Sequence, residues 1–259
     1  MNENVYQHFR TEEHAFIDYC EELLEKVENE YRPILSRFLD PRERFIFESV
    51  IGGRGFKFEF YGGYEGAERS RALLYPEYHE VSTTDFEIAT YEIQYPIKFA
   101  TLTHRSILGS VMSIGLDRAL FGDIITDGEH WQLFLEDRSK EYITMQFTAV
   151  GKTRIRLEEI DYTKLLKPID VWVEEVSTVS SLRIDTVIAE VFRLSRSKVK
   201  TYVQAGKVKL NFHEEDRPNV ELEINDVISV RGLGRLKIER IEGKTKKEKI
   251  RTAFLVLRN

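Results

Sequence analysis

The stretch SLRIDTVIAEVFRLSRSKVKTYVQAGKVKLN, from Ser181 to Asn211, decides the fold of the C-terminal part of this chain. Its first half predicts a helix from Leu182 to about Phe192, because apolar residues recur every three or four positions. Ser195 is a typical N-cap residue, and it predicts a second helix that ends at Gly206. Strand-like segments follow, so two short helices are expected beside a small sheet.

Basic side chains gather in this C-terminal part. Residues 177–259 contain 18 Lys and Arg against 11 Asp and Glu, a net charge of +7, whereas residues 1–176 contain 20 against 33, a net charge of −13. The net charge of −6 for all 259 residues therefore hides a basic module on an acidic body. Such an asymmetry indicates two roles in one chain.

The second predicted helix presents cations around its N-terminus. Unpaired backbone N–H groups and the positive end of the helix dipole at Ser195 suit a phosphate. Such a surface suits the backbone of folded RNA, because side chains cannot read its deep major groove. Arg196 and Lys200 are four residues apart on the free face, so replacing both by Glu is expected to remove RNA binding without unfolding the domain. The predicted RNA-binding residues are Arg183, Ser195, Arg196, Ser197, Lys198, Lys200, Lys207, Lys209, Arg231 and Arg235.

Four ordered motifs make this part resemble the S4-type RNA-binding domain. They are LRID at 182–185, SRS at 195–197, GKVKLN at 206–211 and NDVISVRG at 225–232. Phe212 stands where that family has a glycine, so a tighter or shifted turn is expected there. A solvated helix surface is the plain alternative for these cations, and the helix cap, the net charge and the motifs together decide against it.

The first 176 residues predict a helical start and then a mixed domain. Residues 3–30 have a helical period, Asp40-Pro41 opens a short helix to about Val50, and residues 56–61 alternate like a strand. From about residue 88 the expected order is strand, helix, strand, strand, helix, strand, in which residues 98–101 also look strand-like. This is the order of ferredoxin-like and RNA-recognition-motif (RRM) folds.

The sequence thus predicts an α+β chain in three parts. Residues 1–85 are an N-terminal helical and strand segment, residues 86–176 an RRM-like βαββαβ domain, and residues 177–259 the S4-type domain, with the Ser/Thr stretch 177–181 as a linker. With GGYEGAER at 62–69 and THRSILG at 103–109, the whole chain is similar to the YlmH family of bacterial S4-domain proteins. That resemblance implies ribosome-associated RNA binding, the rescue of stalled large subunits and a link to cell division.

Signals of an enzyme are poor. Gly53-Arg54-Gly55 and Gly232-Leu233-Gly234 lack the third glycine of a dinucleotide loop, and Gly243-Lys244-Thr245 lacks the first glycine of a P-loop. A lone Cys20 excludes an intrachain disulfide, and no histidine spacing fits a metal site. We therefore expect no catalytic residue, no metal and no cofactor. The alternative is an RNA-modifying or tRNA-acting enzyme with an appended S4 domain.

The expected partners are rRNA and tRNA on the large ribosomal subunit that holds a peptidyl-tRNA. The predicted strand Trp131–Leu135 lacks the aromatic pair with which RRM domains stack bases, so that mode is not expected in the middle domain. The acidic N-terminal region offers a surface for a protein partner, and a division scaffold is a third reading that is compatible with RNA binding. No signal peptide or membrane span is predicted, which indicates a cytoplasmic protein with no membrane partner.

Overall fold

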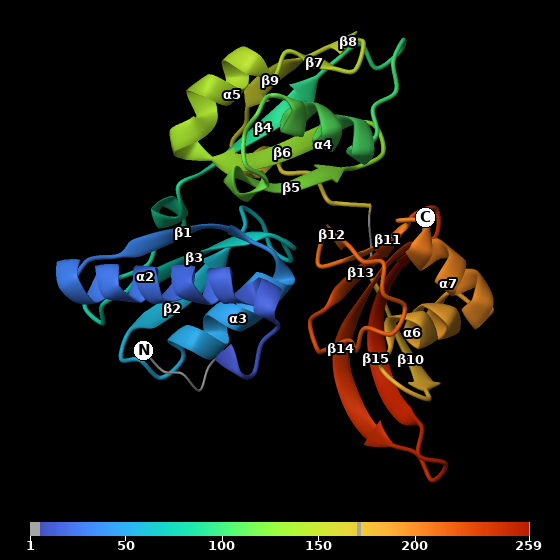
Figure 1. Cartoon of the computed structure of the whole chain (residues 1–259). Helices are drawn as coiled ribbons and strands as arrows, with labels where there is room; N and C mark the ends of the chain where they lie inside the picture. Colours follow the sequence, from blue (N-terminus) through green and yellow to red (C-terminus); the bar gives the residue numbers. More distant parts are fainter. Residues whose placement is uncertain (1–5, 170–171, 259) are drawn as a thin grey trace. The chain divides into compact units, whose positions relative to one another are not determined.

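The computed structural model describes residues 6–169 and 172–258 (Figure 1). The chain divides into two compact units, residues 1–169 and residues 170–259. Both units mix helices with antiparallel sheets, which confirms the predicted α+β class. Within the described residues, no helix has the length and apolar character needed to cross a membrane.

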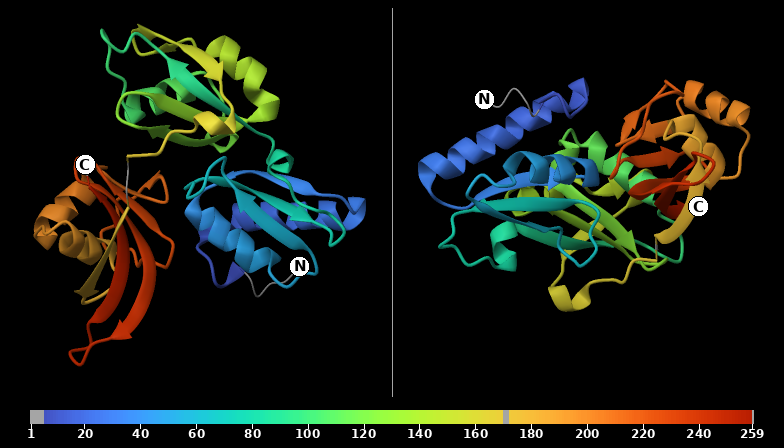
Figure 2. Two further views of the ribbon diagram at one scale, coloured as in Figure 1. Left: turned by 180° about the vertical axis from the view of Figure 1, so that it is seen from behind. Right: turned by 90° about the horizontal axis from the view of Figure 1, so that it is seen from below.

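The first unit begins with two helices on one face of a three-stranded sheet (Figure 2). The helices are α2 (His14–Glu30), preceded by the 3-10 turn η1 (Thr11–Glu13), and α3 (Pro41–Ile51). The sheet order is β1 (Ile34–Leu39), β3 (Ser70–Tyr75) and β2 (Lys57–Tyr61). Asp40 caps α3 as predicted, because its carboxylate accepts the backbone N–H groups of Arg42 and Glu43, each at 2.9 Å. The sequence did not predict β1.

A ferredoxin-like sheet completes the first unit. Its strands are β4 (Ile88–Gln94), β5 (Phe121–Thr126), β6 (Trp131–Glu136) and β9 (Arg156–Glu159), in the order β5-β6-β4-β9. This order confirms the predicted split βαβ pattern. One face packs against α4 (His104–Ser113) and α5 (Lys140–Gln146), which contribute Ile107, Val111 and Ile143 to the core.

Short elements fill the connections of the first unit. They are the 3-10 turns η2 (Thr83–Phe86), η3 (Arg118–Leu120), η4 (Asp137–Ser139) and η5 (Tyr162–Lys164), and the small hairpin of β7 (Ala149–Val150) and β8 (Thr153–Arg154). The strand expected at residues 98–101 is absent from the described fold. The backbone N–H groups of Phe99 and Ala100 instead bond to the Pro96 carbonyl, at 2.9 and 3.0 Å, which makes a turn.

Buried polar contacts join the two sheets of the first unit. The Asp123 carboxylate on β5 accepts the Tyr64 hydroxyl at 2.7 Å and the backbone N–H groups of Glu68 and Arg69 at 2.8 and 3.1 Å. The Arg69 guanidinium donates to the carbonyls of Phe38 and Phe121 at 3.0 and 3.2 Å. The GGYEGAER motif at 62–69 is therefore an anchor between the sheets.

The second unit is a six-stranded antiparallel sheet with two helices on one face. The sheet order is β10 (Val173–Val179), β15 (Ile250–Arg258), β14 (Gly234–Lys244), β13 (Val227–Val230), β11 (Val208–Leu210) and β12 (His213–Glu214). The helices are α6 (Ile184–Val191) and α7 (Arg196–Gln204). The sequence predicts a linker at residues 177–181, but residues 177–179 pair with β15 as part of β10. The division of the chain into three parts stays a prediction.

Removing the Asp123 carboxylate tests the anchor. Asp123→Ala leaves three donors without their acceptor, so the first unit should lose about 2 to 3 kcal/mol of unfolding free energy. Urea unfolding followed by Trp131 fluorescence in a Trp172→Phe background measures this loss. Glu65→Ala, an exposed acid in the same loop, is the matched control and should change little. Equal unfolding curves for the two variants would contradict the anchoring role.

Candidate nucleic-acid interface

Helix α7 begins where the sequence predicts. The Ser195 hydroxyl accepts the backbone N–H of Lys198 at 3.3 Å, and it lies 3.1 Å from the Ser197 hydroxyl. Val199 and Val203 are fully buried on the core side of the helix. Lys198 and Lys200 are exposed on the other side, and the described residues offer their side chains no ion-pair partner. Two free ammonium groups and a capped helix N-terminus thus share one surface.

The buried Asp185 carboxylate organises the two arginines beside that surface. Its side chain has no exposed area, and it accepts Arg196 Nη2 at 2.8 Å and Arg183 Nε and Nη2 at 3.2 Å each. Burial by itself raises the pKa of Asp185, but the hydrogen bonds and charges of the two arginines outweigh it, and the net pKa is lowered. Arg196 therefore differs from the free cation that the sequence predicts.

The arginines keep donors for a ligand. The side chains of Arg183 and Arg196 are 38% and 52% exposed, and a guanidinium carries five N–H groups, of which these contacts use two on Arg183 and one on Arg196. A guanidinium held by a buried carboxylate loses little rotamer freedom when it binds a phosphate. The pair therefore presents fixed donors beside the two exposed lysines.

Two further predicted residues lie near the end of α7. The Lys207 ammonium lies 5.1 Å from the centre of the Tyr202 ring. The backbone carbonyl of Lys207 accepts the backbone N–H of Arg231 at 2.9 Å. Both side chains are exposed. Lys207 and Arg231 thus extend the cationic surface from α7 to the adjoining ends of β11 and β13.

The remaining predicted residues lie on the sheet face that points away from the helices. Lys209, Ser229 and Arg235 form one row across β11, β13 and β14. The Arg235 guanidinium lies 5.3 Å from the Trp172 ring centre and 5.7 Å from that of Phe212. The sequence prediction missed both aromatic residues. The only signal for Phe212 was its departure from the family glycine.

Phe212 occupies a strained position in the turn between β11 and β12. Asn211 and Phe212 have φ angles of +46° and +69°, a region that favours glycine and costs a phenylalanine about 1 kcal/mol. The Asn211 side chain holds the turn, since it donates to Asp226 at 2.8 Å and accepts the Val227 N–H at 2.9 Å. The Asn and Asp of the motifs are therefore structural, and the ring of Phe212 is placed against Arg235.

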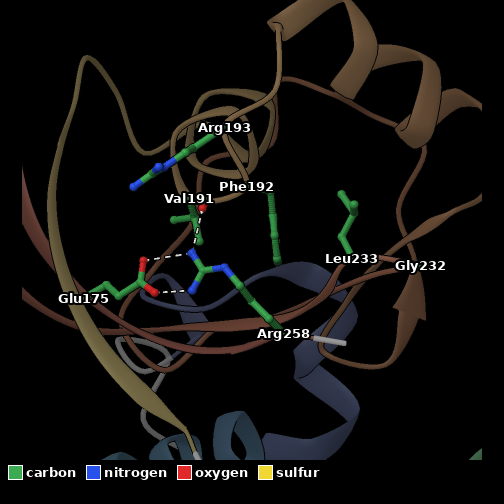
Figure 3. Close-up of a pocket in the computed structure, with 7 residues that line it drawn as sticks. All are labelled: Glu175, Val191, Phe192, Arg193, Gly232, Leu233 and Arg258. Carbon is green, nitrogen blue, oxygen red and sulfur yellow. Dashed lines mark hydrogen bonds and ion pairs between the residues drawn. The ribbon is translucent and has the colours of Figure 1, made fainter.

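A pocket of the second unit lies at the end of α6 (Figure 3). Arg258 pairs with Glu175 there and donates to the Val191 carbonyl at 3.1 Å, so its charge is already compensated. None of the ten predicted residues lines this pocket, which is lined by Glu175, Val191, Phe192, Arg193, Gly232, Leu233 and Arg258.

The described residues offer no metal site and no reactive thiol. Among them no cluster of His, Cys, Asp or Glu suits a metal ion. Burial raises the pKa of the Cys20 thiol, which keeps it protonated.

The two helices on the C-terminal sheet define a class of protein, the S4-domain proteins. The S4 domain family matches residues 182–228, and a family described as "Putative RNA-binding domain in YlmH" matches residues 82–164. "Ribosome-associated protein quality control protein P2" of Bacillus subtilis (strain 168) is 42% identical over 252 residues, which are 97% of this chain and 98% of that protein. The chain therefore belongs to the YlmH family.

A solved structure agrees with this assignment. "Cell division protein ylmH from Streptococcus pneumoniae" is 34% identical and has a TM-score of 0.55. The similarity covers 62% of this chain and 99% of that one.

The ion pair with Asp185 predicts different outcomes for two neighbouring cations. Arg196→Glu places a second carboxylate beside a buried one, so the second unit should lose about 1 to 2 kcal/mol of unfolding free energy, a value reduced because Arg196 is half exposed. Lys200→Glu should leave stability unchanged. Urea unfolding followed by Trp172 fluorescence in a Trp131→Phe background measures both. An Arg196→Glu protein as stable as Lys200→Glu would refute the structural role of the pair.

The lowered pKa of Asp185 also predicts an acid dependence. A carboxylate whose pKa is lower in the folded state stabilises that state above its unfolded pKa of about 3.9 and loses this contribution as the pH falls further. Asp185→Asn should therefore lower stability at neutral pH and flatten its decline below about pH 4. The same fluorescence measured between pH 7 and acid tests this. Asp216→Asn, an exposed change in the same unit, should keep the wild-type pH profile.

Proposed function

We propose that this chain is a non-catalytic RNA-binding factor that acts in the cytoplasm on large ribosomal subunits that still hold a peptidyl-tRNA. The observation that carries the proposal is the surface at the start of α7, where Lys198 and Lys200 stand beside two arginines fixed on Asp185. Ion-paired arginines and exposed lysines around a helix N-terminus suit closely spaced phosphates. Folded rRNA and tRNA backbones present such phosphates where they converge.

The relatives support the ribosome as the setting. The name of the Bacillus subtilis relative describes that protein as ribosome-associated and as a quality control protein, and the similarity spans nearly the full length of both chains. Rescue of stalled subunits is the form of quality control that we propose here. The name of the Streptococcus pneumoniae structure supports a further link to cell division, for which the acidic part of this chain offers a surface to a protein partner.

The chemistry of the surface favours binding over catalysis. The ten predicted residues carry guanidinium, ammonium and hydroxyl groups, and the Asp185 carboxylate between two of them is buried and accepts hydrogen bonds from both arginines. Neither a free general base nor an activated nucleophile stands among the ten predicted residues. An RNA-modifying or tRNA-acting enzyme remains the alternative function. Mass spectrometry of RNA recovered after incubation with the protein would detect such an activity.

Charge reversal of the two free lysines tests the proposal. Lys198→Glu with Lys200→Glu should weaken binding to purified bacterial large subunits that carry peptidyl-tRNA by about 10- to 100-fold and reduce the log–log salt slope by about 2. The control, Lys246→Glu with Lys247→Glu, has the same net charge and changes the exposed turn between β14 and β15.

Sucrose gradients extend the test to cells with stalled ribosomes. Wild-type and control protein should sediment with large subunits, and the Lys198/Lys200 variant should not. Wild-type protein that stays at the top of the gradient at low salt would overturn the proposal. Equal losses for the variant and its control would refute the assigned surface.

A further inference from the structure

We infer that the first unit carries a second RNA-contacting surface, at the end of the ferredoxin-like sheet where the loop 95–103 and the β7–β8 hairpin emerge. This basic rim consists of Lys98, Phe99, Arg105, Lys152, Arg154 and Arg156. Its ligand is RNA, with phosphates on the cations and one unstacked base on the Phe99 ring. The inference rests on the proposed function, because it takes the ligand to be the same class of molecule.

The charge of the first unit is unevenly distributed. Residues 1–176 are strongly acidic overall, yet the segments 93–116 and 142–157 contain no Asp or Glu. The five cations of the basic rim all come from these two segments and are exposed. They differ from Arg42, Arg54 and Arg138, which form ion pairs with acids of the same unit. The rim cations are therefore available to an anionic ligand.

The fold brings the two acid-free segments together. Gln94 at the end of β4 pairs with Arg156 at the start of β9, so the loop after β4 and the hairpin before β9 leave the sheet at the same end (Figures 1 and 2). The turn of that hairpin contacts α4, since the Gly151 N–H donates to the Ser110 hydroxyl at 3.2 Å. Arg105 lies on the first turn of the same helix. The cations thus line one edge of the domain.

The face that RRM domains use for RNA is closed in this protein. RRM domains stack bases on the open face of their four-stranded sheet. Here Gln132 and Phe134 on that face of β6 have no exposed area. The Phe134 ring lies 5.0 Å from the Tyr64 ring, and Gln132 exchanges hydrogen bonds with the backbone of Lys164 and Leu166 at 2.9 and 3.0 Å. RNA that binds this domain must use another surface, and the basic rim offers the charge for it.

Phe99 has the exposure that base stacking requires. Its side chain is 89% exposed, and the turn that begins at Pro96 holds its backbone in place. Stacking a base on the ring removes apolar surface from water. Such stacking accepts any of the bases, because each has a flat aromatic face. Lys98 is adjacent in sequence and supplies a phosphate contact beside the stacked base. Within the described residues the rim cations have no ion-pair partner. An exposed aromatic ring among such cations fits single-stranded or looped RNA better than an acidic protein, because only RNA offers both phosphates and an unstacked base.

Binding of full-length variants to purified bacterial large subunits carrying peptidyl-tRNA tests the cations. Lys152→Glu with Arg154→Glu should weaken binding about 10-fold. Lys26→Glu with Lys57→Glu, two exposed lysines of the same unit outside the rim, has the same net charge and should change affinity less than about twofold. Rim and control variants of equal affinity would overturn the inference.

The Lys198/Lys200 variant separates this result from a failure of the proposed function. If it binds less tightly while the rim variant binds like its control, the S4 surface stands and the rim inference fails. If wild-type protein does not bind the subunits, the proposed function itself fails.

Phe99→Ala tests the stacked base. It should weaken binding about 5- to 10-fold and remove an ultraviolet crosslink between RNA and the segment 95–105. Tyr142→Ala, a half-exposed aromatic residue on α5, is the matched control. A protein that crosslinks only through its second unit, with unchanged affinity in Phe99→Ala, would refute the stacking role.

Discussion

The candidate surface of the second unit depends on one buried carboxylate. Asp185 has no exposed area, and its charge is tolerable there only because Arg183 and Arg196 bind it. The same contact fixes their guanidinium groups beside the start of α7, where both side chains stay partly exposed. A structural requirement of the core and a functional requirement of the surface are thus met by the same three residues. The LRID and SRS motifs of this chain are therefore in direct contact through Asp185.

Polar contacts play a different role in the first unit. Asp123 and Arg69 bind backbone groups across the boundary between two sheets, so they close one face of the ferredoxin-like sheet and hold it against the N-terminal segment. A fold whose open face often binds RNA thereby becomes a layer inside a larger unit. The RNA contact that we infer for this domain therefore lies at its edge, where the segments 93–116 and 142–157 contain no acids. The net negative charge of residues 1–176 gives no indication of this basic edge.

The turn at Asn211 and Phe212 shows how strain and function meet. A glycine at position 212 would adopt the positive φ angle without cost, but it would remove one of the two aromatic contacts of Arg235. Asn211 and Asp226 stabilise the turn through hydrogen bonds, and the strain at Phe212 is offset within a well-connected hairpin. Trp172 reaches the same guanidinium from the other end of the unit's sequence.

The sequence by itself determined the features that depend on neighbouring residues. The caps at Asp40 and Ser195, the βαββαβ order and the buried stripe of α7 depend on residues a few positions apart, so pattern and composition predict them. Strand β1 and the pairing of residues 177–179 in β10 needed the tertiary structure, because each depends on a strand distant in sequence. The contact between Asp185 and Arg196 needed it too, because it joins two different helices. From the sequence alone, Arg196 and Lys200 are both free cations on the same helix. Only the position of a buried carboxylate 11 residues before Arg196 separates the arginine that supports the fold from the lysine that is free to bind.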